Sequence, residues 1–437
     1  MEIIADLHIH SRYAMATSPK LELESIYRWC KIKGIHVIGT ADFTHPVWFA
    51  GLKEKLELAD GGLYKLKPKY SKEIDKELPS SVSENIVRFI PTVEISTIYS
   101  KNGRVRKVHS VIVVPTLAYA AKLTAKLSKI GNLKVDGRPI LGMDAKDLLK
   151  MTLDLSPDAL YFPAHIWTPW FSLFGSRSGF DSIEEAYEEL APEIKAVETG
   201  LSSDPFMNWR LSQLDNMTLI SGSDAHSLPK MGREATVFDC DLDYFEIVNA
   251  IKSNDKRLLG TIEFYPQEGR YHYDGHRKCG VKFSPSETKK HKGICPVCGK
   301  PLVVGVMYRV DEIADRPQKY KPKSHKKVEY IVPLVEVIAE MKGVKGVNTK
   351  TVLTEYEKLY SALGDEFSIL RKYPVSRIKD AGFPVLADAV SRMRNGDLHI
   401  EPGYDGIYGV VSLFGKQDEA DSVECDNKKE QNQIGMF

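Results

Sequence analysis

The chain has 437 residues, which is too long for one ordinary hydrophobic core and suggests two to four domains. Its 60 Lys and Arg nearly balance its 59 Asp and Glu, which excludes any argument for a polyanionic partner based on overall charge. The sequence shows neither an apolar leader nor a run that could span a bilayer, so we expect a soluble cytoplasmic protein with no membrane partner.

From Met1 to about Gly260, seven short β-branched runs alternate with segments whose apolar spacing fits amphipathic helices, such as LELESIYRWCKIKG and DSIEEAYEELAPEI. This alternation predicts an α/β fold over residues 1–268, with parallel strands covered by helices. Periodicity leaves a closed barrel and an open sheet as alternatives. The seven runs are EIIADLHIH, HVIGTAD, FIPTVEI, VHSVIVV, LYFPAH, AVETG and LISGSDA.

The composition changes at about Gly269. Residues 270–330 hold fifteen Lys and Arg against six Asp and Glu, and clustering on this scale favours a polyanionic partner. A solvated basic loop is the alternative, and it is the commoner explanation of any single charge run. We therefore expect a basic domain over residues 269–330. A mostly helical DNA-binding region is expected over residues 331–415, followed by a polar, acidic and disordered tail over residues 416–437.

Metal-competent side chains stand at or near the end of each apolar run. In a strand, His8 and His10 would project to the same face, and the carboxyl ends of parallel strands meet at one edge of a sheet. Each residue alone is more often structural, but together they predict a polynuclear metal site: His8, His10, Asp42, Glu94, His109, His165, Glu198, Asp224 and His226. Imidazoles and carboxylates suit zinc, manganese or iron, and two such ions stabilise phosphoester displacement. Hydrolysis of an amide or a nucleobase is the chemical alternative.

The ordered motifs DLHIHS, TADFTH, PTVEIS and GSDAH, with the single His109 and His165 between them, resemble those of the polymerase and histidinol phosphatase (PHP) superfamily. The resemblance implies a seven-stranded distorted β/α barrel of PHP type with two or three divalent metals, Zn²⁺, Mn²⁺ or Mg²⁺. The implied ligands are His8, His10, Glu94 and Asp224 for the first metal, Glu94, His109 and His165 for the second, and Asp42 and His226 for the third. Asp42, Asp224 and His226 would be the catalytic residues.

One departure from that family concerns the third site. The family has adjacent Asp and His in its second motif, whereas this chain separates Asp42 from His45 by two residues. It also has Arg12 and Tyr13 where many members place a further histidine. The third site is therefore either reorganised around His45 or weakly occupied.

A second metal site is predicted in the basic region, where three of the six cysteines lie within twenty residues. The two pairs His276-x-x-Cys279 and Cys295-x-x-Cys298 have the spacing of a zinc ribbon with structural Zn²⁺. His272 and His291 are alternatives to His276 as the fourth ligand. The scattered remaining cysteines, Cys30, Cys240 and Cys425, give no disulfide framework.

The last seven residues, QNQIGMF, place Gln431, Ile434 and Phe437 at the spacing of a sliding-clamp (PCNA) binding motif. Such a peptide inserts its apolar anchors into a pocket of the partner while its linker stays mobile. We predict the clamp as a partner through these residues.

This combination of regions resembles the archaeal DNA repair endonucleases of the PHP superfamily. That resemblance implies cleavage 5′ of deaminated bases (uracil, hypoxanthine, xanthine) and of abasic sites, leaving a 3′-hydroxyl and a 5′-phosphate, at the nucleoid. Candidate base-contacting residues near His165 are Trp167, Ser202, Ser203 and Asn208. A phosphatase for a small phosphomonoester and a non-enzymatic DNA scaffold are the alternatives.

Overall fold

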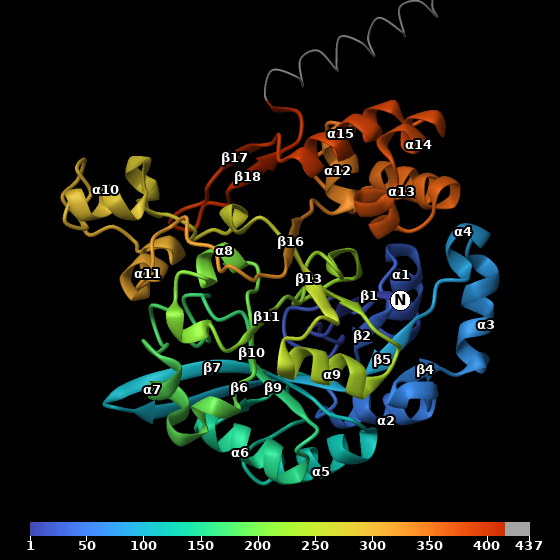
Figure 1. The fold of residues 1–437 in the computed structure, drawn as a ribbon, viewed down its shortest axis with the longest axis horizontal. Helices are drawn as coiled ribbons and strands as arrows, with labels where there is room; N and C mark the ends of the chain where they lie inside the picture. The colour runs from blue at the N-terminus through green and yellow to red at the C-terminus, as the bar shows by residue number, and fades with distance from the viewer. Residues whose placement is uncertain (416–437) are drawn as a thin grey trace, which may run out of the picture.

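All seven apolar runs contain strands, which confirms the α/β fold class in this computed structural model, described for residues 1–415 (Figure 1). The seven runs contribute strands to three sheets, and FIPTVEI, which contains parts of two strands, contributes to two of them. The largest sheet contains, in spatial order, β16 (Lys327–Tyr330), β13 (Leu258–Glu263), β12 (Ala235–Asp239), β1 (Glu2–Asp6), β2 (Val37–Gly39), β5 (Arg88–Ile90), β4 (Tyr64–Leu66) and β3 (Leu56–Leu58). Within it β1, β2 and β5 are parallel, as the alternation with helices predicts.

The second sheet departs from the predicted parallel alternation. Its order is β8 (Ile140–Leu141), β6 (Thr92–Lys101), β7 (Arg104–Val113) and β9 (Leu160–Pro163). β6 and β7 are antiparallel because the turn between them is Asn102-Gly103, and both residues have the positive φ of a two-residue hairpin turn. A tight hairpin leaves no room for a covering helix between these two strands.

A third, two-stranded parallel sheet is formed by β10 (Ala196–Glu198) and β11 (Thr218–Ile220). The backbone beyond β1 and β11 is joined by a bridge between Ile9 and Ala225, which brings the carboxyl ends of these strands together. Closure into a barrel of seven strands stays a prediction.

Helices cover the sheets, and capping residues mark where several of them begin or end. In Figure 1, α5 and α6 lie along the lower side of β6 and β7. α1 ends at Gly34 in the left-handed conformation, and α9 begins at Asp243, whose carboxylate accepts backbone N–H bonds. The predicted helix after Asp181 is short, because a 3₁₀ segment containing Pro192 follows it. The helices of this part are α1 (Leu23–Lys33), α2 (Pro46–Lys55), α3 (Pro68–Glu77), α4 (Ser80–Ser83), α5 (Leu117–Leu127), α6 (Ala145–Leu155), α7 (Ile183–Tyr187), α8 (Pro205–Asn208) and α9 (Tyr244–Ser253).

The basic region leaves the main sheet and returns to it. It holds the hairpin β14 (Asp274–His276) and β15 (Val281–Phe283), and the helices α10 (Pro285–Lys290) and α11 (Val306–Ile313), which project at the left of Figure 1. Its last strand, β16, pairs in parallel with β13. The predicted domain over residues 269–330 therefore shares its final strand with the first region.

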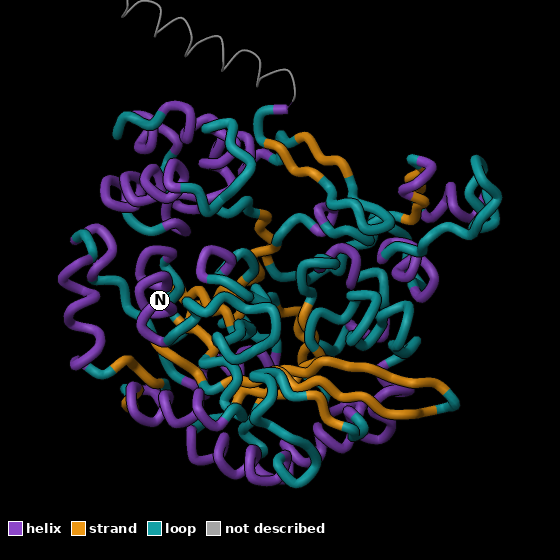
Figure 2. Tube along the Cα trace, turned by 180° about the vertical axis from the view of Figure 1, so that it is seen from behind, coloured by secondary structure: helices purple, strands orange, loops and turns teal. Residues whose placement is uncertain are grey.

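Residues 331–415 are mostly helical, as predicted, and form the upper layer in Figures 1 and 2. The elements are α12 (Leu334–Met341), α13 (Lys350–Leu363), α14 (Val375–Asp380), α15 (Pro384–Asn395) and the hairpin β17 (His399–Glu401) and β18 (Val410–Ser412). A buried ion pair of 2.9 Å between Lys33 of α1 and Glu366 joins this layer to the main sheet region. Among the described residues, no helix combines the length and apolar character needed to cross a bilayer.

Candidate metal centre

Strands of three sheets, and the loops that follow them, bring seven metal-competent side chains together. His8 and His10 follow β1, Glu94 lies in β6, His109 lies in β7, His165 follows β9, Glu198 ends β10, and Asp224 follows β11. Six of these form two groups whose ligand atoms lie within 4.8 Å of one another. The first group is His8, His10, Glu94 and Asp224, and the second is Glu94, His109 and His165.

Glu94 belongs to both groups through different oxygen atoms. Its Oε2 lies 3.2 Å from His10 Nε2 and 3.6 Å from His8 Nε2. Its Oε1 lies 2.7 Å from His109 Nδ1 and 3.2 Å from His165 Nε2. One carboxylate between two sets of imidazoles has the arrangement of a bridging ligand.

His8 supplies the test of whether a cation fits. Its Nδ1 lies 2.9 Å from Glu198 Oε2, so Nδ1 carries the proton and donates to the carboxylate. Its Nε2 is buried without a hydrogen-bond partner and faces Glu94 and, at 3.7 Å, Asp224 Oδ1. A buried, unpartnered imidazole nitrogen facing carboxylates suits a divalent cation, and Glu198 orients the ring as metal-site carboxylates do.

The electrostatics of the centre also suit a cation. Burial raises the pKa of Asp224 and of Glu94, but the adjacent imidazoles of His10 and His109 more than offset it, and both pKa values lie well below the usual range. Burial lowers the pKa of His109 to about 4. The two carboxylates are therefore ionised and His109 is neutral at neutral pH, as metal ligation requires. Burial lowers the pKa of His8, His10 and His165, but adjacent carboxylates more than offset it and hold these pKa values above the ordinary value, so a cation would compete with protons for these rings.

Backbone strain concentrates at the same place. His165, Asp224 and Asp42 all have positive φ, at 30°, 46° and 39°. Such conformations cost about 1–3 kcal/mol each for residues with a side chain, and they persist where the surrounding fold enforces them. The strain is typical of a functional site.

Asp42 and His226, the predicted third-site residues, lie beside these groups but outside them. Asp42 Oδ1 is 3.3 Å from His10 Nδ1, and its Oδ2 accepts hydrogen bonds from the N–H and hydroxyl of Ser11. His226 Nδ1 is 2.8 Å from the carbonyl oxygen of Asp224, and its ring centroid is 4.7 Å from that of His10. Asp42 thus orients His10 as Glu198 orients His8, and a third metal stays a prediction.

His45 lies outside both ligand groups, and its part in a third site stays a prediction. Its Nδ1 accepts the backbone N–H of Trp48 at the start of α2, and its ring stacks on Tyr13 at 4.3 Å. These contacts give His45 a structural explanation.

Arg138 is a functional candidate that the sequence analysis missed. Its Nη1 lies 3.2 Å from Glu94 Oε2, and its side chain is 21% exposed, so the guanidinium faces both the bridging carboxylate and solvent. The preceding Gly137 donates to the carbonyl of Tyr13, and a Cβ at Gly137 would lie only 2.3 Å from Asp42 Oδ2. A lone arginine in a loop gives no spacing signal, so no motif could have found it.

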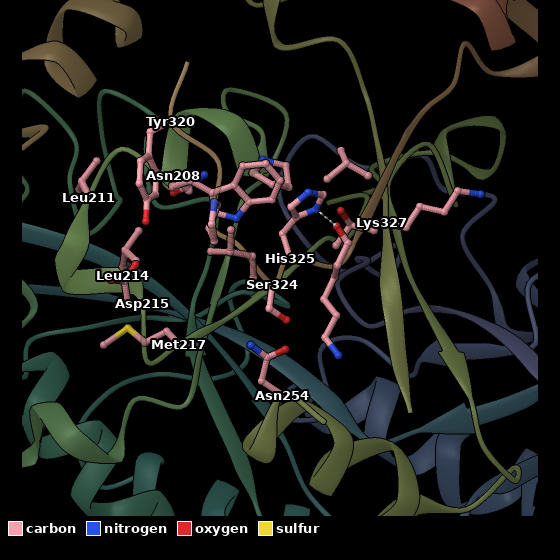
Figure 3. A pocket seen from close by; sticks show the side chains of 17 residues that line it. Asn208, Leu211, Leu214, Asp215, Met217, Asn254, Tyr320, Ser324, His325 and Lys327 are labelled. Atoms are coloured by element: carbon pink, nitrogen blue, oxygen red, sulfur yellow. Dashed lines mark hydrogen bonds between the residues drawn. The ribbon is translucent and has the colours of Figure 1, made fainter. Parts of the chain in front are cut away.

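Three of the four candidate base-contacting residues form a buried network. Trp167 is 1% exposed and donates its indole N–H to Asn208, whose amide donates to Ser203; Ser202 is half-buried. Asn208 also lines a cavity of about 430 Å³ between α8 and the segment around His325 (Figure 3). None of the metal-competent groups above lines this cavity. The hydrogen-bonding groups of Asn208 and Ser203 are used inside the protein, and their role in base contact stays a prediction.

The second predicted metal site is assembled in the basic region. The ligand atoms of His276, Cys279, Cys295 and Cys298 lie within 4.8 Å of one another, and His276 Nδ1 is 3.3 Å from Cys298 Sγ. His276, and not His272 or His291, is the histidine brought to the cysteines. Burial opposes ionisation of Cys295, yet backbone N–H groups of Cys298 and Val297 lower its pKa to about 6. The clamp-binding candidates Gln431, Ile434 and Phe437 lie outside the described residues.

Comparisons with known proteins agree with this site. Residues 208–255 match the PHP-associated family, and residues 333–397 match the MJ0043 C-terminal domain family. The fold and the site define the chain as a metal-dependent hydrolase of PHP type. The lesion-specific endonuclease PfuEndoQ of Pyrococcus furiosus has 30% identity with this chain at a TM-score of 0.81, with 95% of this chain and 96% of that one covered. The chain therefore belongs to the endonuclease Q family and is an endonuclease by membership.

Two further relatives extend this result. A complex of endonuclease Q with a 27-mer duplex carrying an abasic lesion at the active site has 29% identity and a TM-score of 0.79, covering 96% of this chain and 98% of that one. The uncharacterized protein MJ0043 of Methanocaldococcus jannaschii is 31% identical over 289 residues, which is 62% of this chain. The alignment spans only 35% of that longer relative.

Proposed function

We propose that this chain is a DNA repair endonuclease that cuts the phosphodiester 5′ of a damaged nucleotide. Deaminated bases and abasic sites are the proposed lesions, and a 3′-hydroxyl and a 5′-phosphate are the proposed products. The observation that carries the proposal is the bridging position of Glu94 between two groups of imidazoles, in a chain that aligns over 95% of its length with a lesion-specific endonuclease. The family member bound to a duplex with an abasic lesion supports DNA as the substrate class.

The side chains of the centre have separate roles in such a reaction. The two groups would hold two divalent ions (Zn²⁺, Mn²⁺ or Mg²⁺), with a third beside Asp42 and His226, and such ions would activate the water and stabilise the attacking and leaving oxygens of the phosphoester. Glu198 and Asp42 hold the rings of His8 and His10 in the orientation in which Nε2 faces the centre. Arg138 can donate to a non-bridging phosphate oxygen, because its guanidinium stands at the solvent side of Glu94.

The other regions would serve DNA binding. A structural Zn²⁺ in the Cys/His site would hold a small fold together, and the surrounding lysines and arginines would contact phosphates. A sliding clamp bound through Gln431, Ile434 and Phe437 would keep the enzyme on chromosomal DNA in the cytoplasm.

The test is to map the cut on four labelled duplexes that carry uracil, hypoxanthine, an abasic site or no lesion. We expect one nick on the 5′ side of each lesion and none in the undamaged duplex. Equal cleavage of all four would contradict lesion recognition. Rapid turnover of a small phosphomonoester without nicking would favour a phosphatase instead.

A further inference from the structure

Three segments that are far apart in the sequence place aromatic rings and one arginine in a row, which we call the aromatic ladder: Trp170, Tyr271, Arg270 and Tyr408. The rings of Trp170 and Tyr271 meet edge to face with centroids 5.8 Å apart. The guanidinium carbon of Arg270 lies 5.9 Å from the Tyr271 centroid and 5.2 Å from the Tyr408 centroid.

The ladder is open to solvent. Trp170 is 45% exposed and Tyr408 is 68% exposed, although large aromatic rings usually bury most of their surface. Among residues 1–415, no carboxylate forms an ion pair with Arg270. The ladder therefore offers ring faces and an unneutralised positive charge together, and packing against the core does not explain it.

The backbone holds the ladder in place. The N–H groups of Gly406 and Gly409 donate to the carbonyls of Arg270 and Glu268, each at 3.0 Å. A Cβ at Gly409 would lie 2.1 Å from the carbonyl oxygen of Gln267, so only glycine permits this approach. These contacts explain the glycine-rich stretch EPGYDGIYG, and they fix Tyr408 beside Arg270 before any ligand binds.

The ladder begins next to the metal centre. Phe171 follows Trp170, and its ring centroid lies 4.8 Å from that of His109, a member of the second ligand group. Phe171 has a positive φ of 59°, and its carbonyl accepts the N–H of His109. Lys107 Nζ lies 5.0 Å from the centroid of the Phe171 ring. Phe171 connects the ladder to the cleavage site.

We propose that the aromatic ladder stacks the unpaired bases that arise where the duplex opens around the cleavage site. Every base offers a flat π face, so exposed rings bind unpaired bases whatever their sequence, and an arginine between rings adds charge attraction and stacking. A paired base hides its faces in the duplex, so the ladder distinguishes opened from closed DNA. This inference rests on the proposed function, because it assigns DNA as the ligand.

The experiment measures binding of the full-length protein to two undamaged duplexes of equal length. One is fully paired, and the other carries a central loop of three unpaired thymines in one strand. The variants are Trp170→Ala and Tyr408→Ala, with Tyr408→Trp to restore a ring. Phe245→Ala is the matched control, because Phe245 is 47% exposed but lies on α9, outside the ladder.

We expect each ladder alanine variant to lower the affinity for the looped duplex roughly tenfold, with no more than a twofold change for the paired duplex. Tyr408→Trp should retain the affinity, and Phe245→Ala should change neither. An equal loss of affinity for both duplexes, or no loss of affinity for the looped duplex, would overturn the proposal that the ladder stacks unpaired bases. Lesion nicking is measured separately. If the wild-type protein nicks lesions and the alanine variants bind the looped duplex as well as it does, the ladder proposal alone is refuted. If the alanine variants lose affinity only for the looped duplex but the wild-type protein nicks no lesion, the proposed function alone is refuted.

Discussion

The two metal-competent sites of this molecule are built in opposite ways. The PHP-type centre gathers residues from His8 to Asp224 that lie in, or shortly after, strands of three sheets, and extended hydrophobic clusters pack those strands. The Cys/His site lies within residues 276–298, and its hydrophobic cluster contains three buried residues, Val281, Cys295 and Leu302. The fold positions the first site, whereas the second site has too small a core to hold its own fold without an ion.

The largest expected effect is loss of cleavage on removal of a ligand from the first site. His8→Ala deletes the nitrogen that faces Glu94 and Asp224, and it should lower the nicking rate on the order of 10³-fold, because several kcal/mol of charge stabilisation are lost. The variant should keep its circular dichroism spectrum, because the sheets position the site. Nicking at the wild-type rate would contradict the role of His8 as a metal ligand. Global unfolding would contradict the view that the sheets position this site without an ion.

A smaller effect is expected at the residue that orients the same ring. Glu198→Gln keeps the shape but weakens the acceptor for His8 Nδ1, so nicking should fall about 10–100-fold. Added divalent metal should restore part of the rate, because the ligand atoms themselves remain. Glu189→Gln is a suitable control, because Glu189 is a surface carboxylate on an exposed ion pair. A loss that no metal concentration reverses would point to a catalytic role for Glu198.

Loss of a ligand from the Cys/His site should unfold only the region around it. Cys298→Ser removes one thiolate, so the chain should lose about one zinc and residues 276–305, which exclude the aromatic ladder, should become sensitive to protease. Nicking should fall about tenfold at physiological salt and recover at low salt, because only phosphate contacts are weakened. Retained zinc and an unchanged protease pattern would show that this region folds without the ion.

The same difference explains what the sequence could predict. The rule that functional groups collect at the carboxyl ends of strands accounts for His8, His10, His165 and Asp224. It does not account for Glu94 and His109, which lie within β6 and β7. The Cys/His site follows from spacing. Arg138 and the aromatic ladder could not be predicted, because tertiary packing places lone residues of separate loops together. The Asn102-Gly103 turn was a readable hairpin signal that the β/α alternation obscured. Trp167 and Trp170 share one loop, and only the structure separates the buried ring from the exposed one.

The smallest predicted effect concerns stability and not cleavage. Glu234 is fully buried near Glu263, and one of its carboxylate oxygens has no hydrogen-bond partner. Burial, and then the charge of Glu263, raise its pKa well above the ordinary value. Above that ordinary value the unfolded chain releases this proton while the folded chain retains it, so stability falls as the pH rises toward the folded pKa.

Glu234→Gln should therefore stabilise the protein by about 1–2 kcal/mol at pH 8 and much less at pH 5, because the amide needs no proton. Denaturant unfolding at the two pH values measures the difference, and the surface variant Glu73→Gln should change neither. Since Glu234 directly precedes β12 of the largest sheet and accepts the backbone N–H of Phe264 after β13, the gain should appear in the unfolding of the sheets and leave zinc retention by the Cys/His site unchanged. A stabilisation that is equal at both pH values would show that the Glu234 carboxyl is already ionised in the folded protein.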